Sequence, residues 1–263
     1  EKELRIINEL NFNAYFLITW DIIRYARSRG YFHVGRGSGA NSIVAYCIGI
    51  TDVDPVELDL YFERFINEHR TSPPDFDIDF SWDERDDIID YIFKRYGSKH
   101  VCLLATYVTF RDKSIYRELA KVFGLPKAEI DAWLDPATAI REVTSEIQAL
   151  IVKYGQLLLD FPNYLSIHAG GILISDAPLS AYTALEGMPK GFPICQFDMY
   201  VAEEIGFAKF DILSQRGLGH IKEAVDIIRA NRGQDVDIHR VQEFMKDEGV
   251  RGERRWKKKK TWR

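Results

Sequence analysis

Three aspartates alternate with apolar residues in the short run Asp75–Phe80, which reads DFDIDF. Successive side chains of a β-strand point to opposite faces of the sheet, so Asp75, Asp77 and Asp79 would share one face. Neighbouring carboxylates on that face would lie about 7 Å apart, and their repulsion would raise a pKa or demand a cation. Two Mg²⁺ ions about 3.5–4 Å apart would meet that demand and could support a phosphoryl displacement. Oxygen ligands of this kind suit Mg²⁺ better than Zn²⁺.

Another aspartate, Asp211, stands between Phe210 and Ile212 in a second strand-like run. Lys209 is two residues away, so its side chain would project from the same face as Asp211. A lysine and an aspartate presented together could serve a nucleotide phosphate and a metal ion. Two plainer interpretations stay open: an edge strand whose charges discourage aggregation, and an ordinary solvent-facing Lys–Asp pair.

A glycine-rich turn, GRGSGANS at residues 35–42, precedes an apolar helical segment. A helix N-terminus offers free N–H groups and the positive end of a dipole, and glycines let a phosphate approach the backbone. Ser38 could donate its hydroxyl hydrogen, and Arg36 supplies a full positive charge. The run lacks the Gly-Lys-Ser/Thr of a P-loop and the spacing of a dinucleotide-binding fingerprint. By itself it is typical of a simple turn, and its position before the aspartate strand is what favours a phosphate site.

The elements that must position these residues follow from the spacing of apolar side chains. A helical spacing runs through the first thirty residues, and Gly30 stands where that helix would stop. Further helices are expected over residues 41–48 and 55–65. Ser81 would cap the next helix, with Glu84 in the position of a capping box.

Residues 82–160 are expected to be mainly helical, with helices near 111–123 and 139–154. Strand-like alternation returns at residues 171–174 and 206–213. Because strand-bearing segments flank a helical block, the sequence predicts a mixed α/β (α+β) fold with a helical subdomain inserted into it.

Composition places the chain among globular proteins: 263 residues, 46% hydrophobic and 29% charged. No run approaches the roughly 18–20 uncharged apolar residues of a membrane span, and the amino terminus lacks the pattern of a secretory signal. The 3 cysteines have no metal-site spacing, which favours a reducing cytoplasm. The net charge of −5 does not by itself support DNA binding, because phosphate contacts use Lys and Arg.

Taken together, these segments resemble the bacterial C-family DNA polymerases, the DNA polymerase III alpha subunits. The resemblance runs from near residue 1 to about residue 245. The segments that carry it are Tyr15–Ile18, Trp20–Asp21, Gly35–Tyr46, Gly49–Pro55, Phe62–Phe65, Pro74–Phe80, Tyr96–Gly97, His168–Gly171 and Lys209–Asp211. Pro73–Pro74 and residues 105–110 are more similar to the error-prone second type of alpha subunit.

The resemblance implies a palm similar to that of the DNA polymerase beta-like nucleotidyltransferases, with an inserted, mainly helical thumb. It implies that Asp77, Asp79 and Asp211 are catalytic and bind two Mg²⁺ ions, with Asp75 secondary and His168 structural. The residues implied to contact the incoming triphosphate are Arg36, Gly37, Ser38 and Lys209. Basic residues expected to contact DNA phosphates are Lys94, Arg95, Arg111, Lys113, Arg117 and Lys121, although such helix faces are usually just solvated.

On the same resemblance, residues 1–81 would form the first part of the palm and residues 82–160 the thumb. Residues 161–247 would complete the palm and lead to the fingers. Residues 248–263 form a basic tail that we expect to be disordered or foreign sequence.

The implied function is template-directed DNA synthesis, in replication or damage tolerance, from primer–template DNA and dNTPs in the cytoplasm. In the full-length protein a sliding clamp and other replisome subunits would be partners. We expect the chain to be a truncated fragment that is inactive alone, since no fingers follow the palm. Two alternatives stay open: a non-catalytic, DNA-binding palm–thumb remnant, and a metal-dependent phosphoesterase, against which the absence of a His/Asp cluster counts.

Overall fold

The computed structural model describes residues 1–61, 67, 72–135 and 143–237. In this part the helices are α1 (Lys2–Glu9), α2 (Asn13–Ser28), η1 (3₁₀, Ser38–Asn41), α3 (Ile43–Cys47), α4 (Arg85–Tyr96), α5 (Asp112–Val122), α6 (Lys127–Trp133), α7 (Glu146–Leu158), η3 (3₁₀, Leu179–Ala181), α8 (Met199–Glu204) and α9 (Arg216–Arg232). The strands are β1 (His33–Arg36), β2 (Asp77–Ser81), β3 (Val101–Thr109), β4 (Pro162–Ile174), β5 (Glu186–Gly187), β6 (Pro193–Ile194) and β7 (Lys209–Gln215). The described helices include none that is long and apolar enough to cross a membrane.

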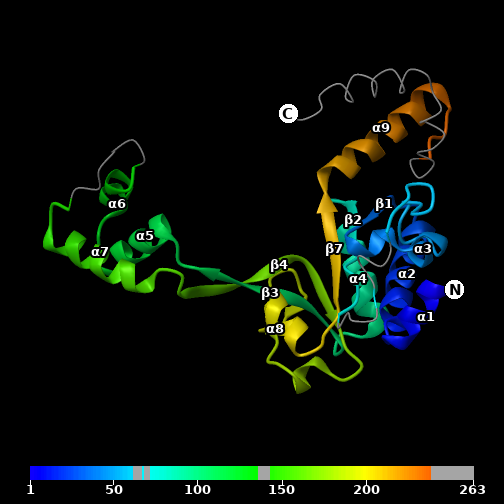
Figure 1. Cartoon of the computed structure of the whole chain (residues 1–263). Helices are drawn as coiled ribbons and strands as arrows, with labels where there is room; N and C mark the ends of the chain where they lie inside the picture. The colour runs from blue at the N-terminus through cyan, green and yellow to red at the C-terminus, as the bar shows by residue number, and fades with distance from the viewer. Residues whose placement is uncertain (62–66, 68–71, 136–142, 238–263) are drawn as a thin grey trace, which may run out of the picture.

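The strands form one mixed sheet of seven strands in the order β1-β2-β7-β4-β3-β6-β5. β2 runs parallel to β7, whereas β1 pairs with β2 and β4 pairs with β7 in the antiparallel sense. β2 and β7, which are far apart in the sequence, therefore lie side by side in the sheet (Figure 1). The expected mixed α/β architecture is confirmed.

One face of the sheet is buried beneath α1, α2 and α4. The apolar residues of the aspartate strand, Phe76, Ile78 and Phe80, are at most 2% exposed and belong to this main core. Tyr15 of α2 stacks on the Phe76 ring at 5.4 Å, and its hydroxyl accepts a hydrogen bond from the Phe76 N–H. Burial of these aromatic rings fixes which face of β2 points inward, and so leaves the aspartates on the other face.

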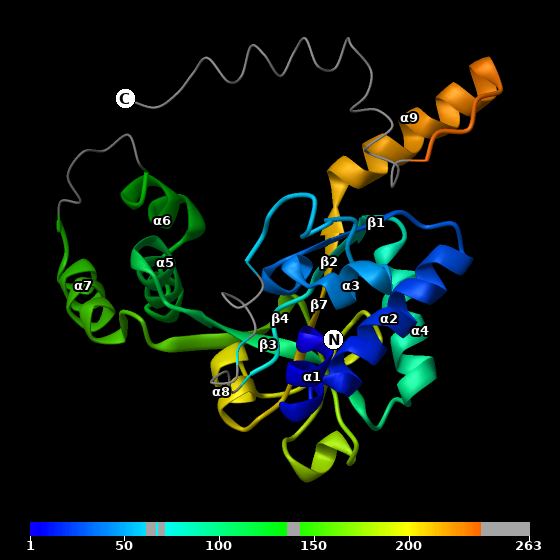
Figure 2. The same cartoon turned by 45° about the vertical axis from the view of Figure 1, so that its right-hand side comes forward.

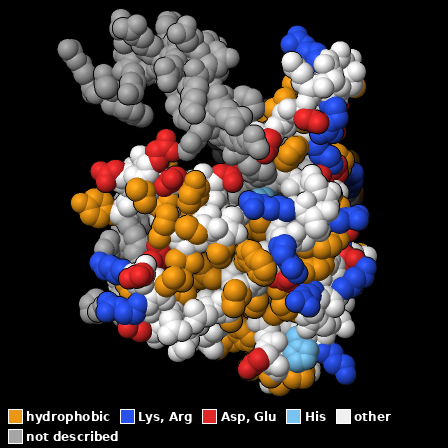
Figure 3. All heavy atoms as spheres, turned by 90° about the vertical axis from the view of Figure 1, so that its right-hand side faces the viewer, with side chains coloured by type: hydrophobic (Ala, Val, Ile, Leu, Met, Phe, Trp, Pro, Cys, Tyr) orange, Lys and Arg blue, Asp and Glu red, His pale blue; other side chains and the backbone are white. Residues whose placement is uncertain are grey.

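The second face is covered only in part. Leu173 of β4 is the cross-strand partner of Lys209, and it packs with Leu104 and Ala202 in a small cluster under α8. Residues paired across neighbouring strands share a face, so Lys209 lies on the same side as this cluster. The helical layer over the first face, which contains α1 and α2, also has a surface that points away from the sheet. Figure 3 shows hydrophobic side chains gathered on this surface, and Leu4 of α1 and Leu17 of α2 are exposed.

β3 and β4 extend beyond the sheet as a long ribbon that carries α5, α6 and α7 at its far end (Figures 1 and 2). These helices pack around their own small cluster, which contains Ala120, Ile130 and Ile151. α4, by contrast, packs in the main core through Ile88 and Ile92. Residues 82–160 therefore do not pack as one helical unit: α4 covers the sheet, and the β3 strand separates it from α5–α7.

Several expected helix boundaries differ from the structure for local reasons. The helix expected over the first thirty residues is broken at Asn11, whose φ of 59° is left-handed. Ser81 ends β2 instead of capping a helix, and α4 begins after Glu84. In the helix expected over 55–65, residues 55–59 form a turn, and residues 62–65 lie outside the described part.

The contact between α2 and α4 includes a buried carboxylate with several donors. Asp21 accepts hydrogen bonds from the Tyr91 hydroxyl at 2.8 Å, the Tyr96 hydroxyl at 3.0 Å and Arg95 Nε at 3.1 Å. Beside it, the rings of Tyr25 and Tyr91 stack with centroids 3.9 Å apart. Burial acts to raise the pKa of Asp21, but the hydrogen bonds from two tyrosines and Arg95 outweigh it and hold the pKa below its ordinary value. Asp21 therefore stabilises the α2–α4 contact in its ionised form.

We predict that Asp21→Asn lowers the free energy of unfolding by about 2 kcal/mol at pH 7, because a charged acceptor is lost from a buried network. A lowered folded pKa gives stability that is full above the unfolded pKa of about 3.9 and is lost as pH falls through the folded value. The difference between wild type and variant should thus be constant from about pH 7 to pH 5 and shrink below about pH 4. Urea unfolding followed by circular dichroism measures it.

Asp90→Asn is the matched control, because Asp90 lies on α4, the helix that supplies the donors to Asp21, but pairs with Lys94 on the surface. An exposed pair contributes about 0–1 kcal/mol. Equal losses for the two variants, or an Asp21→Asn deficit that persists at pH 3, would contradict this account of the contact.

Candidate active site

Three aspartates from two strands meet on the open face of the sheet. In the β2–β7 register Asp77 lies directly opposite Asp211, and Asp79 is two residues further along β2. Two residues along a strand correspond to about 7 Å, and alternate residues share a face. Asp79 and Asp211 are buried, at 5% and 6% exposure, whereas Asp77 is partly exposed. The pairing of β2 with β7 thus brings three carboxylates together at a place where two of them have little contact with solvent.

Two basic side chains compensate that charge. Arg36, at the end of β1, spans both carboxylates of β2: its Nη1 lies 2.8 Å from Asp77 Oδ2 and its Nε 2.7 Å from Asp79 Oδ2. On β7, Lys209 Nζ lies 2.9 Å from Asp211 Oδ2. Gln215 donates a further hydrogen bond from Nε2 to Asp79 Oδ1 at 3.2 Å. Each aspartate is therefore paired with a basic side chain, and Asp79 also accepts from Gln215.

The pKa values of the site follow from burial and charge. Burial raises the pKa of Asp77, Arg36 opposes the rise, and the nearby charge of Asp211 adds to it. The hydrogen bond with Asp79 raises the pKa of the Arg36 guanidinium. For Lys209, burial acts to lower the pKa, but the contact with Asp211 outweighs it and the net shift is upward. Arg36 and Lys209 accordingly stay charged, and the raised pKa of Asp77 means that additional positive charge nearby would favour its ionised form.

One carboxylate oxygen shows where that charge would fit. Asp211 Oδ1 is buried and has no hydrogen-bond partner among the described residues. His168 Nδ1 is 4.0 Å away, but this nitrogen accepts the N–H of Gly171 at 2.8 Å and so cannot also donate to Asp211. Burial lowers the pKa of His168, against the pull of Asp211. A buried, unsatisfied anionic oxygen is costly, and a divalent cation bound by oxygen ligands would satisfy it.

The described side chains contain no group of three or more His, Cys, Asp or Glu residues with the spacing of a formed metal site. The ion pairs with Arg36 and Lys209 occupy the carboxylates instead. The residues present nevertheless fit Mg²⁺ in kind, since the three aspartates offer hard oxygen ligands on one face. Arg36 would have to turn away from Asp77 and Asp79 for ions to bind there.

The glycine-serine turn lies beside the start of the aspartate strand. The Asp75 N–H donates to Ser38 Oγ and the Gly39 N–H donates to the Asp75 carbonyl, both at 2.9 Å. Ser38 Oγ accepts in its bond and so keeps its own hydrogen for donation. Gly37 has φ of +93°, and a Cβ built there would lie 2.5 Å from the Asp75 oxygen. The turn can approach β2 this closely only because residue 37 is glycine.

All the residues expected at the triphosphate lie around the aspartates. Arg36, Gly37 and Ser38 continue from the end of β1, and Lys209 begins β7. Asp75 lies before β2 and its side chain is exposed. Gln215 was missed by sequence reasoning, although its position four residues after Asp211 puts it on the same face of β7.

The basic residues expected to contact DNA fall into two groups. Lys94 and Arg95 belong to α4, where they pair with Asp90 and Asp21, and so they are not part of the α5–α7 unit. On that unit the ion pairs are Arg111 with Asp160, Arg117 with Asp131 and Lys121 with Glu118. Lys113 belongs to α5, and its side chain lies outside the described part.

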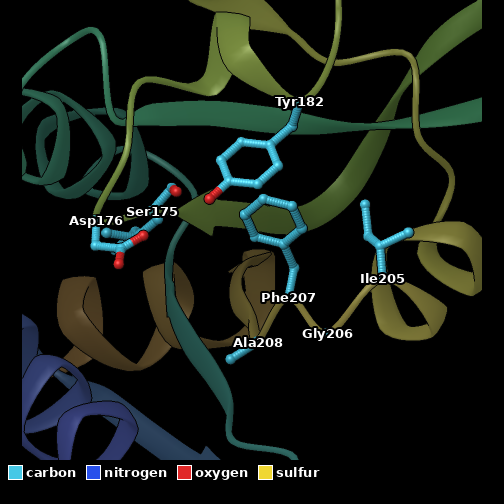
Figure 4. Close-up of a pocket in the computed structure, with 8 residues that line it drawn as sticks. Ser175, Asp176, Tyr182, Ile205, Gly206, Phe207 and Ala208 are labelled. Atoms are coloured by element: carbon cyan, nitrogen blue, oxygen red, sulfur yellow. The ribbon is translucent and has the colours of Figure 1, made fainter.

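A separate pocket of about 220 Å³ opens at the end of β4, next to the start of β7 (Figure 4). The Tyr182 hydroxyl is directed toward Ser175 and Asp176, and the Tyr182 and Phe207 rings meet edge to face at 5.1 Å. The lining residues are Ile174, Ser175, Asp176, Tyr182, Ile205, Gly206, Phe207 and Ala208. None of the three site aspartates lines it, so it is not part of the carboxylate site.

Comparison with known proteins identifies the family. Residues 1–214 match the family described as Bacterial DNA polymerase III alpha NTPase domain, and the chain belongs to this family. The resemblance expected from the sequence is thereby confirmed.

Curated relatives carry the name Error-prone DNA polymerase. The one from Symbiobacterium thermophilum is 39% identical over 259 residues, which cover 92% of this chain and 23% of that protein. The one from Bordetella parapertussis is 36% identical over 264 residues, with 92% and 24% covered. The one from Methylococcus capsulatus is 37% identical over 254 residues, with 90% and 24% covered. The chain thus spans about a quarter of the length of these relatives.

We predict that Gly37→Ala destabilises the fold by about 2 kcal/mol more than Gly97→Ala, because overpacking against backbone typically costs 1–3 kcal/mol. Both glycines have a positive φ, 93° and 90°, so both variants suffer similar backbone strain. A Cβ at residue 97 would have its nearest neighbour at 3.8 Å, compared with 2.5 Å at residue 37. Urea unfolding of the two variants measures the difference, and equal losses would show that the approach to Asp75 is not tight.

Proposed function

We propose that the chain carries the nucleotidyl-transfer centre of a bacterial DNA polymerase, which transfers the nucleoside monophosphate of a dNTP to the 3′-hydroxyl of a primer and releases pyrophosphate. The observation that supports it is the convergence of Asp77, Asp79 and Asp211 on one face of two central strands, beside the turn at Ser38. A palm of the DNA polymerase beta-like nucleotidyltransferase type would combine the same two parts. Family membership supports the polymerase class.

In this proposal the three aspartates would hold two Mg²⁺ ions. When bound, such ions make a primer hydroxyl more nucleophilic and stabilise the charge on the departing pyrophosphate. Asp211, whose Oδ1 has no hydrogen-bond partner among the described residues, would help to hold the ion next to the primer hydroxyl. Asp77 and Asp79 would help to hold both ions.

The residues around the aspartates would bind and orient the triphosphate. Backbone N–H groups near Gly37 and the hydroxyl hydrogen of Ser38 would donate to phosphate oxygens. Arg36 and Lys209 would exchange their carboxylate partners for phosphate, because the anionic substrate and the ions arrive together. This exchange leaves the net charge of the site nearly unchanged, because the charges of the ions and of the triphosphate offset each other, and it avoids leaving a buried charge without a partner.

The unit of α5–α7 would contact the primer–template duplex as a thumb. Three of its described basic residues, Arg111, Arg117 and Lys121, are already paired with carboxylates on the surface. Exposed pairs contribute about 0–1 kcal/mol, so DNA phosphates could take over the cations at little cost. In the whole polymerase, which would act in the cytoplasm, a sliding clamp and other replisome subunits are the partners that we propose.

We predict that the 263-residue chain binds Mn²⁺ at the aspartates but extends a primer poorly by itself. The relatives are about four times longer than the matched region, and we propose that their remaining parts close over the nascent base pair. Loss of such positioning can remove several kcal/mol of barrier lowering. Electron paramagnetic resonance of Mn²⁺ and Mg²⁺-dependent primer extension measure the two properties.

Asp211→Asn should weaken Mn²⁺ binding about tenfold or more, since a direct charged ligand is lost. Asp75→Asn is the matched control because its side chain is exposed and precedes the strand. Unchanged Mn²⁺ affinity in Asp211→Asn would refute the metal site. Robust template-dependent synthesis by the chain alone would refute its dependence on other parts, and duplex binding without Mn²⁺ binding would favour the non-catalytic alternative.

We also predict that Arg117→Ala with Lys121→Ala weakens binding to a primer–template duplex by about fivefold and lowers the salt slope by about one for each lost phosphate contact. Lys94→Ala, which removes a paired lysine from α4 instead, should leave affinity unchanged. Fluorescence anisotropy over a range of NaCl concentrations measures both, in a chain that ends at residue 247 so that the basic tail does not contribute. Equal effects of the two changes would exclude α5–α7 as the DNA-binding unit.

A further inference from the structure

A buried glutamate from the first helix holds the element that follows the glycine-serine turn. Glu3 is 5% exposed, and its carboxylate accepts the N–H of Ile43 at 3.0 Å and of Val44 at 3.4 Å. It also accepts the hydroxyl hydrogen of Ser42. These N–H groups open α3 and would otherwise lack partners within the helix. A residue of α1 therefore completes the cap of α3 across 39 positions of sequence.

Ser42 joins this cap to the turn. Its hydroxyl oxygen accepts the Ala45 N–H at 3.0 Å, and its backbone N–H donates to the Gly39 carbonyl at 3.1 Å. Gly39 lies in η1, which begins at Ser38. The position of Ser42 thus fixes where the last residues of the turn lie.

The turn is consequently anchored at two points, one to the segment that leads into β2 and the other to helix α1. At its start, Ser38 and Gly39 bond the backbone of Asp75, which leads into the aspartate strand. At its end, Ser42 bonds Glu3, which belongs to the helical layer behind the sheet. Neither anchor alone determines the direction in which the amides of η1 point, because a short 3₁₀ turn can pivot about a single fixed end.

We infer that Glu3 is a positioning residue for the triphosphate-binding turn: it sets the orientation of Gly37 and Ser38 through Ser42 and does not touch the substrate. The inference rests on the nucleotide role proposed above. It assigns a task to a residue outside every motif that suggested the site.

The sign of the effect separates positioning from simple electrostatics. A carboxylate near a triphosphate site repels the anion, so removing its charge would tighten nucleotide binding if charge were all that mattered. If Glu3 acts by orienting the turn, Glu3→Gln must weaken binding instead, because the amide nitrogen of glutamine meets N–H donors and the cap opens. The two accounts predict opposite shifts in affinity.

The experiment titrates Mg²⁺·dATP into the whole 263-residue chain by isothermal titration calorimetry and measures urea unfolding of the same proteins. Asp21→Asn is the matched control, since Asp21 is also a buried carboxylate with several donors but ties α2 to α4. We expect Glu3→Gln to weaken dATP binding about fivefold or more, as misplaced donors do, and Asp21→Asn to change it by less than about twofold. Both variants should lose comparable stability in urea, because each breaks a buried hydrogen-bonded carboxylate.

Ser42→Ala provides a second route if Glu3→Gln does not fold. It removes the hydroxyl that links Glu3 to the turn and leaves the Ile43 amide in place, so it should weaken dATP binding in the same direction. In the double variant the two losses should not add, since both break one linkage. Unchanged or tighter dATP binding in both single variants would overturn the role of Glu3 while leaving the proposed function intact. A wild-type chain that binds Mn²⁺ but no dATP would instead overturn the nucleotide site, and the inference with it.

Discussion

The parallel pairing of β2 with β7 is the constraint on which the rest of the structure depends. It sets Asp77 beside Asp211, although these residues are far apart in the sequence. Two like charges on adjacent strands oppose that pairing, so the fold needs both a large apolar contribution and local compensation. Phe76, Ile78 and Phe80 supply the first by burying the opposite face, and the side chains of Arg36 and Lys209 supply the second. The alternating sequence of β2 therefore provides both the apolar residues that stabilise the fold and the aspartates that line the open face.

The remaining elements keep this arrangement in place. α2 covers the strands from behind, where the Tyr15 ring and hydroxyl both reach Phe76. β1 brings Arg36 to the carboxylates and continues directly into the Gly37 turn, so one connection delivers both the cation and the backbone that we propose to bind phosphate. Helices of the rear layer act on the front of the sheet through backbone caps, as the bond between Glu3 and Ser42 illustrates.

Much of this could be predicted from the sequence because it depends on local alternation. The inward and outward faces of β2, the grouping of Lys209 with Asp211, and the mixed α/β class all follow from residue order. The register between β2 and β7 could not be derived, since it reflects the packing of the whole core. Ser81 looked like a helix cap, but burial of Phe80 keeps the strand intact through residue 81. Likewise, only tertiary contacts reveal that α4 covers the sheet while α5–α7 stand apart.

The β3–β4 ribbon has a mechanical consequence. Its register is irregular between Leu103 and Ala105, where it leaves the sheet, and again near Thr109. β-Bulges bend and twist a strand locally, so these two places set the direction of the ribbon at its base and at its tip. Beyond Ala105 the ribbon consists of Ala105–Thr109 and its partner residues Pro162–Ile167, a length of about 20 Å at about 3.3 Å per residue. A change of a few degrees in the bend at Ala105 would move α5–α7 by an amount proportional to this length, and it would leave the carboxylate strands, which lie on the other side of the bend, unchanged.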